Sequence, residues 1–232
     1  MDQPKSQGRE ARTIALAVVI GLFVLMQVVL AVVLRVDTLD MDVGPNNQPS
    51  PDFFGPTDIG QTFAAAGENI GRIDLLFGTH GRSGTYRIGF ELYEAGPPEA
   101  IVATSEIEAS GLRNNLFNTF RFPAVRGTRG RAFRIRLAAP AATASDAVAL
   151  WTNGGDILPD GTFFYNGAPA AGDLVFRVYS RRTAVSELAR VVGRNPGVLS
   201  SPILFVLVLL LLEASLIWTL VSIVDRVFER RD

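Results

Sequence analysis

Hydrophobic residues concentrate in two long blocks near the ends of the chain. The first covers residues 13–34, where no charge occurs between Arg12 and Arg35, and the second covers residues 202–224. At 1.5 Å per residue, the first block reaches about 33 Å as a helix, enough for a hydrocarbon core of about 30 Å. A cleaved signal peptide is the alternative, but this run exceeds a usual signal core and no small-x-small cleavage site follows it. We therefore predict two transmembrane helices, at 13–34 and 202–224.

Basic residues flank the outer sides of both blocks: Lys5, Arg9 and Arg12 before the first, and Arg226, Arg230 and Arg231 after the second. Positively charged flanks favour the cytoplasmic side of a membrane. The sequence thus predicts a two-pass protein of the bacterial inner membrane. Its termini, 1–12 and 225–232, are expected in the cytoplasm, and the region between the helices in the periplasm.

One acidic residue, Glu213, lies near the middle of the second block, where a carboxylate requires a partner or a proton. In the first block, Ala17, Gly21, Gln27 and Ala31 fall within an arc of about 120°, which suits close helix packing. Two interpretations stay open: a protonated Glu213 bonds to Gln27 of its own chain, or it faces another subunit. A packing or assembly role is favoured over proton transfer, because a relay needs more ionisable groups.

Between the two blocks, apolar and polar residues alternate with a period of two, which is typical of half-buried strands. Eight candidate strands, separated by Gly- and Pro-rich turns, lie near 61–65, 70–78, 84–94, 101–108, 117–123, 131–138, 147–152 and 173–180. Many short strands with almost no helical pattern predict an all-β sandwich of the jelly-roll type, with about eight strands over residues 59–182.

Two connecting segments have their own patterns. Residues 36–58 are rich in Asp, Pro and Asn and predict an extended linker or irregular cover. Residues 183–200 begin with apolar residues at helical spacing, and Thr183 is suited to cap a helix there. We expect a short amphipathic helix that leads to the membrane surface.

Composition excludes several kinds of chemistry. The 232 residues carry a net charge of −1, no cysteine and a single histidine, His80. Disulfides, thiolate metal sites and cysteine nucleophiles are excluded, zinc is disfavoured, and no nucleic-acid-binding surface is indicated. His80 lies in a Gly-rich turn without a nucleophile-elbow motif nearby, so we predict no serine-hydrolase triad and no enzyme activity.

Three aspartates in or beside Gly-rich turns are the candidates for calcium: Asp156, Asp160 and Asp173. Oxygen ligands on loops suit this ion, but the spacing is not that of an EF-hand. Solvated turn aspartates are the favoured interpretation, and no cofactor is expected.

Exposed aromatic rings can stack on sugars, and Tyr93, Trp151, Phe164 and Tyr165 are the candidates. Aromatic residues in a sandwich more often belong to its core. An arginine-rich group suggests contact with anionic lipid or polysaccharide, although solvated strand faces explain such charges more often; it consists of Arg126, Arg129, Arg131, Arg134 and Arg136.

Two stretches resemble a known module. Gly60-Gln61-Thr62-Phe63, followed by the strand from Ile70, resembles the opening of a galactose-binding-like jelly roll. The stretch from Asp160 through Asn166-Gly167 to Gly172-Asp173-Leu174 resembles its closing hairpin and strand. Such modules occur in bacterial cell-surface and glycan-related membrane proteins. The resemblance covers about residues 60–180 and implies no particular binding residue.

Three functions remain as hypotheses. The favoured one is a noncatalytic accessory or scaffolding subunit of a larger membrane assembly, in contact with lipids and with an integral-membrane partner or further copies of itself. The second is a glycan-binding accessory in cell-envelope polysaccharide synthesis or export. The third, and least favoured, is a glycoside-active envelope enzyme.

Overall fold

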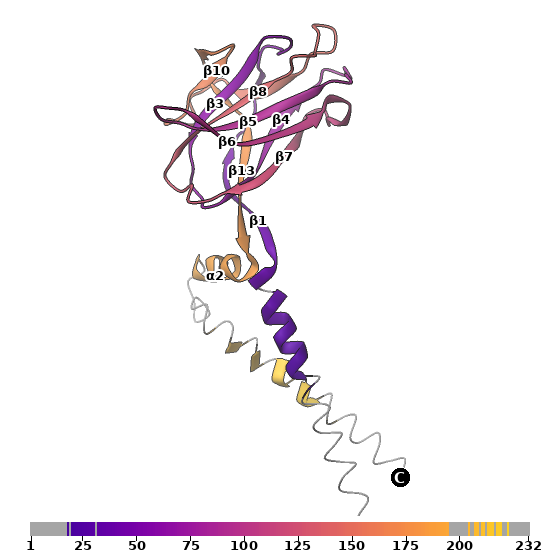
Figure 1. Cartoon of the computed structure of the whole chain (residues 1–232), viewed down its shortest axis with the longest axis vertical. Helices are drawn as coiled ribbons and strands as arrows, with labels where there is room; N and C mark the ends of the chain where they lie inside the picture. Colours follow the sequence, from indigo (N-terminus) through magenta and orange to yellow (C-terminus); the bar gives the residue numbers. More distant parts are fainter. Residues whose placement is uncertain are drawn as a thin grey trace, which may run out of the picture. The chain divides into compact units, whose positions relative to one another are not determined.

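A computed structural model of the chain describes residues 18, 20–30, 32–194, 204, 207–208, 210–211, 213–215, 217–219 and 222 (Figure 1). Ala17, the terminal segments 1–12 and 225–232, and parts of both apolar blocks lie outside the described residues. The chain divides into two compact units, one of Asp37–Arg182 and one of Met1–Val36 with Thr183–Asp232.

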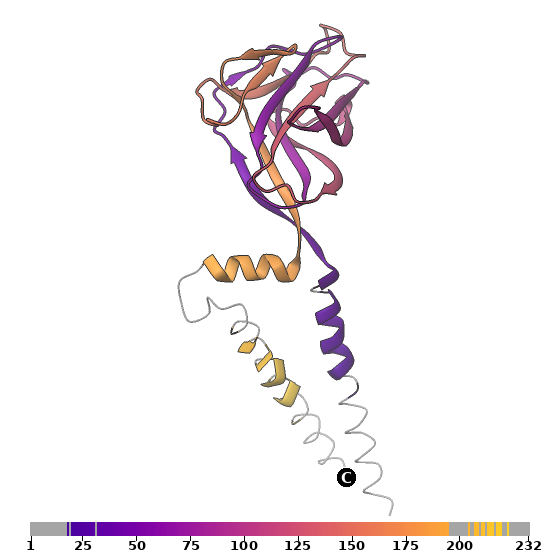
Figure 2. The ribbon, with the colours of Figure 1, turned by 60° about the vertical axis from the view of Figure 1, so that its left-hand side comes forward.

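The larger unit consists of two antiparallel sheets in two layers (Figure 1 and Figure 2). The seven-stranded sheet has the order β1-β13-β4-β9-β12, with β7 also paired to β4 and β2 to β9. Its strands are β1 (Arg35–Val43), β2 (Gln48–Pro49), β4 (Ile70–Gly78), β7 (Leu116–Val125), β9 (Ala149–Asn153), β12 (Asp173–Leu174) and β13 (Phe176–Thr183). The predicted all-β domain is therefore confirmed.

The second sheet has six strands in the order β11-β10-β3-β8-β5-β6. They are β3 (Asp58–Ala64), β5 (Arg87–Glu94), β6 (Ala100–Glu108), β8 (Ala132–Ala138), β10 (Phe163–Tyr165) and β11 (Ala168–Ala170). A 3₁₀ turn at Ala109–Gly111 follows β6.

Phenylalanine rings join the two sheets at the core. Phe63 of β3 lies 5.5 Å from Phe176 of β13, and Phe90 of β5 stacks on Phe120 of β7 at 4.9 Å. All four rings are almost completely buried. Alternating positions on β3, β5 and β8 therefore point into the space between the sheets, as the period of two predicts.

Strand β1 differs from the predicted linker at residues 36–58. It belongs to the seven-stranded sheet, although its inward positions include two polar residues, Thr38, which is buried, and Asp40, whose side chain is 7% exposed. Arg182 Nη2 of β13 donates to Asp40 Oδ1 at 2.9 Å and compensates its charge, while the buried Oδ2 has no hydrogen-bond partner among the described residues. The side chains of Asp40 and Ser180 occupy the space beside Gly67, so a Cβ there would lie 1.7 Å from Asp40 Oδ2 and 2.4 Å from Ser180 Oγ.

The smaller unit is mostly helical where it is described. Residues 18, 20–30 and 32–33 are helical, as are the described residues from 204 to 222. Helix α2 (Ala184–Arg194) lies in the 183–200 segment, and Thr183 Oγ1 accepts the Ser186 N–H at 3.1 Å as its cap. Among the residues that the structure describes, no helix has both the length and the apolar character needed to cross a membrane.

Candidate functional site

The two apolar segments meet through a polar pair, Gln27 and Glu213. The amide of Gln27 is assigned with its nitrogen towards Glu213, because the opposite assignment would place two acceptors together; in this orientation the nitrogen donates to both carboxylate oxygens, at 2.9 and 3.0 Å. Both side chains are half-buried. The structure thus brings together the two residues that the sequence proposes as partners.

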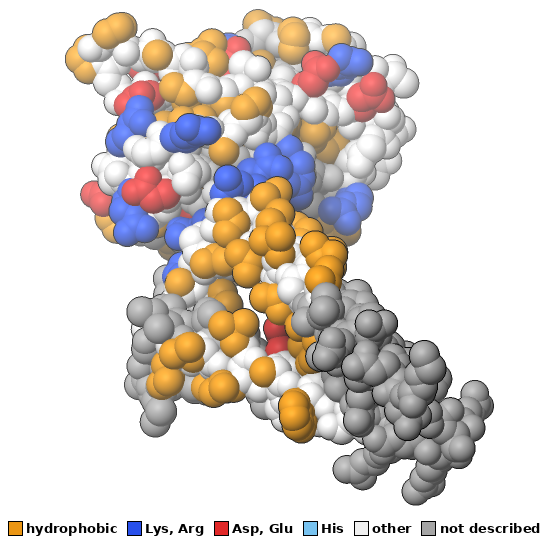
Figure 3. Space-filling model, turned by 60° about the horizontal axis from the view of Figure 1, so that its bottom comes forward, with side chains coloured by type: hydrophobic (Ala, Val, Ile, Leu, Met, Phe, Trp, Pro, Cys, Tyr) orange, Lys and Arg blue, Asp and Glu red, His pale blue; other side chains and the backbone are white. Residues whose placement is uncertain are grey.

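Apolar residues surround this pair. A groove of about 290 Å³ beside Glu213 is lined by Ile20, Val24, Leu210, Ala214, Ile217 and Trp218. Trp218 is highly exposed, with 75% of its surface accessible. Hydrophobic side chains of the described residues form broad patches in Figure 3.

Two hydroxyl side chains of the C-terminal segment behave differently from Glu213. Thr219 Oγ1 donates to the Ser215 carbonyl at 2.8 Å, and Ser222 Oγ donates to the Trp218 carbonyl at 2.9 Å. These are bonds to the helix backbone one turn back, which satisfy a hydroxyl in an apolar environment. Gly21 is exposed on its helix, and a Cβ there would meet no described atom within 4 Å.

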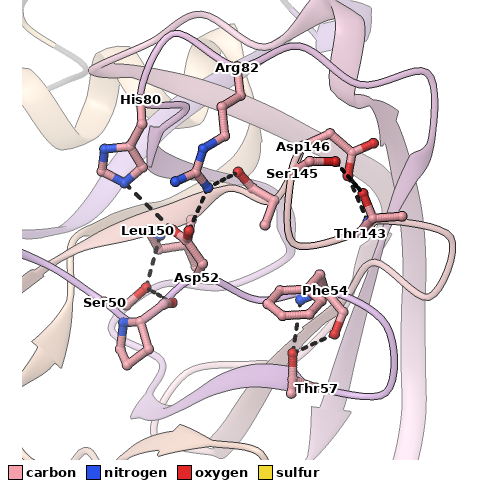
Figure 4. A network of polar contacts seen from close by, with 12 residues as sticks. Ser50, Asp52, Phe54, Thr57, His80, Arg82, Thr143, Ser145, Asp146 and Leu150 are labelled. Atoms are coloured by element: carbon pink, nitrogen blue, oxygen red, sulfur yellow. Dashed lines mark hydrogen bonds and ion pairs between the residues drawn. The ribbon is translucent and has the colours of Figure 1, made fainter.

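In the sandwich, the single histidine belongs to a network that joins three loops (Figure 4). His80 Nε2 lies 3.6 Å from Asp52 Oδ1, and Arg82 Nη1 donates to Asp52 Oδ2 at 2.5 Å. The nearby hydroxyl of Ser50 accepts the Leu150 N–H at 3.1 Å. That hydroxyl also donates to the next backbone carbonyl at 2.9 Å. It therefore holds the local backbone and is not aligned as a nucleophile with His80.

The same region contains a buried tyrosine. Tyr86 OH donates to the Asp146 carbonyl at 2.7 Å, and burial together with the Asp146 charge raises the pKa of Tyr86 to about 12. The Asp146 carboxylate accepts the N–H and hydroxyl of Thr143, and these bonds lower its pKa (Figure 4). This arrangement fixes the turn before β9.

The aromatic candidates for sugar contact are not brought together. Tyr93 lies on β5, donates to Glu91 at 2.7 Å and has the Arg134 guanidinium 4.7 Å from its ring centre. Tyr165 on β10 donates to the Asp52 carbonyl at 3.0 Å and packs against the core. Phe164, beside it, is half-buried.

Trp151 on β9 has a different environment. Its Nε1 donates to Asn115 Oδ1 at 2.9 Å, and it lies above Gly78, where a Cβ would be 3.5 Å from that nitrogen. The imidazole of His80 is 3.9 Å from the same point. His80 and Asn115 both have left-handed backbones, with φ of 52° and 56°. Asn115 was not among the residues proposed from the sequence, although the pair Asn114-Asn115 is a turn signal.

The three calcium candidates differ in environment: Asp173 is buried, whereas Asp156 and Asp160 are exposed. Asp173 is 1% exposed; Oδ1 accepts from Gln61 Nε2 at 2.9 Å, and Oδ2 accepts the N–H groups of Ile157 and Leu158 at 2.8 and 2.9 Å. Both oxygens are therefore occupied by donors, which disfavours a cation. Asp156 and Asp160 are exposed, and the described residues contain no group of three acidic, histidine or cysteine side chains suited to a metal.

Four of the five arginines in the group on the six-stranded sheet and its adjoining turns pair with acidic side chains. Arg136 bonds Asp58 at 2.6 Å and Glu91 at 2.9 Å, which raises the pKa of Arg136. Arg134 and Arg131 pair with Glu99 and Glu94, and Arg129 lies 3.6 Å from Glu68. These ion pairs disfavour the predicted contact with an anionic lipid or polysaccharide at this face.

Comparison with known proteins gives no relative: no protein-family model matches the chain, and no curated protein is significantly similar to it.

Proposed function

We propose that this chain is a noncatalytic, membrane-anchored β-sandwich protein that acts as an accessory subunit of a larger bacterial membrane assembly. The observation that carries the proposal is the contact of Gln27 with Glu213 between two apolar segments. A carboxylate in such a segment is costly unless it has a partner, and it usually faces the interior of a bundle.

The exposed surface of the apolar segments supports a membrane location for them. Large hydrophobic side chains on several sides of both segments are exposed, among them Val33 at 65%, Leu211 at 70% and Trp218 at 75%. Exposed apolar patches of this kind mark sites of contact with lipid or protein. With the positive flanks of the sequence, they favour two spans at 13–34 and 202–224, with both termini in the cytoplasm and the sandwich in the periplasm.

The contacts within the sandwich support a noncatalytic role. Asp52 is shared by His80 and Arg82, the Ser50 hydroxyl is used by the backbone, and the acidic and basic side chains of the six-stranded sheet pair with each other. These contacts hold loops and strands together. We place the domain among galactose-binding-like jelly rolls, supported by Gln61, whose amide joins the opening motif to Asp173 and Leu174 of the closing motif.

Two measurements test this proposal. The chain has no cysteine, so single cysteines at Ser6 and Ser145 provide a topology assay. We expect a membrane-impermeant maleimide, applied from the periplasmic side, to label Ser145→Cys and not Ser6→Cys. After mild detergent extraction from the native membrane, the chain should migrate in a species well above its own 25.1 kDa. Reversed labelling, or migration as a monomer, would contradict the proposal.

A second candidate function, glycan binding, is favoured by the surroundings of Trp151. The indole nitrogen bonds the Asn115 amide, and the His80 imidazole lies on the same side of Gly78 as the indole; amides and imidazoles are groups that hydrogen-bond sugar hydroxyls. Isothermal titration of the full chain in detergent with envelope polysaccharides tests this function. We expect Trp151→Ala to abolish binding and Tyr93→Ala, on the other sheet, to leave it unchanged; no heat of binding to any polysaccharide would reject it.

A further inference from the structure

The groove beside Glu213 is formed by two matching stripes of side chains. Leu210, Glu213, Ala214 and Ile217 recur at spacings of three and four residues, so they share one face of the C-terminal segment. Ile20, Val24 and Gln27 follow the same spacing in the N-terminal segment. The stripes meet at the Gln27–Glu213 contact, and the groove opens beside it.

Glu213 is an acidic group in an otherwise apolar groove. Its described partner, Gln27, is a neutral amide. An ionised carboxylate has about four acceptor positions, and in a medium of low polarity a cation compensates its charge far better than an amide. The hydroxyls of Thr219 and Ser222 bond to the backbone of their own helix. The groove therefore calls for a positive charge beside Glu213.

The chain itself supplies no such charge within its apolar blocks. Residues 13–34 and 202–224 contain no lysine, arginine or histidine. A second copy packed into the groove would bring apolar residues or another Glu213, and two carboxylates repel each other. Charge complementarity thus favours a different protein, and not a second copy of this chain, as the occupant of the groove.

We infer that the groove receives a transmembrane helix of a different protein, which places a lysine or arginine side chain beside Glu213. This inference rests on the proposed function as a membrane-anchored accessory subunit. Trp218, at the rim, supplies an exposed indole to the contact, and Ala214 leaves room for a close approach of the two helices.

Photocrosslinking in the native membrane tests the inference on the full chain. A benzoylphenylalanine replaces Trp218 in one variant and Leu22 in a control. Leu22 is 60% exposed and lies on the side of its helix opposite Val24. We expect an adduct from position 218 only, and mass spectrometry should place it in an apolar segment of another protein that contains a lysine or arginine.

Charge substitutions then identify the contact. Glu213→Gln keeps the size of the side chain and its bond to Gln27, and we expect it to lower the adduct yield at least tenfold. Replacing the partner's basic residue by leucine should have the same effect, and exchanging the two charges should restore the adduct. Without a crosslinker, Trp218→Ala should weaken co-purification although it leaves the polar pair intact; Thr219→Ala is the matched control.

Several outcomes overturn the inference. They are equal adducts from positions 22 and 218, a yield that Glu213→Gln does not change, a partner segment without a basic residue, or adducts only with lipid or a second copy. If the chain still migrates in a larger species in these cases, the proposed function stands and this interface is wrong. If the chain migrates alone, both are wrong.

Discussion

Replacing Asp173 by asparagine should strongly destabilise the sandwich. The carboxylate is 1% exposed and accepts three hydrogen bonds, one from Gln61 and two from the backbone of the loop before β10. Asparagine can keep its one oxygen towards the two loop N–H groups, but its NH₂ group then faces Gln61 Nε2, which loses this acceptor. A hydrogen bond to a charged group contributes about 1.5–3 kcal/mol and a neutral one about 1 kcal/mol, so losing one bond and the charge of the other two should lower the free energy of unfolding by about 4 kcal/mol.

Equilibrium unfolding by urea, followed by circular dichroism of the full chain in detergent, measures this change. A loss of about 4 kcal/mol corresponds to a decrease in Tm of about 10 °C for a domain of this size. Asp160→Asn is the matched control, because Asp160 is exposed and close in sequence, and it should change the stability by less than about 0.5 kcal/mol.

Two results would refute this reasoning. A loss below about 1 kcal/mol for Asp173→Asn would show that the Gln61 amide finds another acceptor and that the charge adds little to the other two bonds. Stabilisation of the wild-type protein by added calcium, absent in Asp173→Asn, would show that the carboxylate is a cation ligand. Either result would remove Asp173 as the residue that holds the loop to the sheet.

Three further predictions concern packing and pH. Gly67→Ala should cost about 2 kcal/mol in thermal unfolding, because its methyl group overlaps the buried Asp40 carboxylate; Gly111→Ala, where a Cβ meets nothing within 4 Å, should be neutral, and equal effects would contradict the packing argument. The raised pKa of Tyr86 predicts a contribution to stability that is intact below pH 10 and lost as pH rises towards about 12. The Tyr86→Phe variant should not show this loss when its stability is measured at alkaline pH, and a profile equal to that of the wild type would show that another group causes the loss. Burial raises the pKa of Glu91, but hydrogen bonds from the neighbouring tyrosine and arginine lower it overall, so its contribution is present above pH 4.5 and is lost on further acidification. Glu91→Gln should cost at most about 1 kcal/mol of stability at neutral pH. The free energy of unfolding of this variant should then depend less on pH in acid than that of the wild type, and a stronger dependence would refute the role given to Glu91.

The strands with regular alternation could be predicted from the sequence. In β4, β5 and β8, inward positions are occupied by Ile, Leu and Phe, so the period of two is clear. Strand β1 was missed because Thr38 and Asp40 occupy its inward positions, and the charge of Asp40 is compensated by Arg182, which is distant in sequence. Strands β10 and β11 have three residues each, too few to display a period.

The candidate sites show the same division between local and long-range information. The contact of Gln27 with Glu213 could be proposed from the sequence, because each is a polar residue within an apolar segment and needs a polar partner. The contacts of Trp151 with Asn115, and of Asp173 with Gln61, join residues far apart in sequence, and a single sequence carries no signal for such pairs. The neutralised arginines belong to this class, because their acidic partners lie on other strands or across turns.

The neighbouring strands β1 and β13 have a consequence for the evolution and engineering of this chain. The Ala184 N–H donates to the Leu34 carbonyl at 3.0 Å, so the chain enters and leaves the sandwich at adjacent backbone positions. The whole domain is thus an insertion between Leu34 and Ala184, two positions whose backbones are hydrogen-bonded to each other. A short Gly-Ser bridge between these two positions should excise it, and another domain whose termini are equally close should replace it without lengthening the connections.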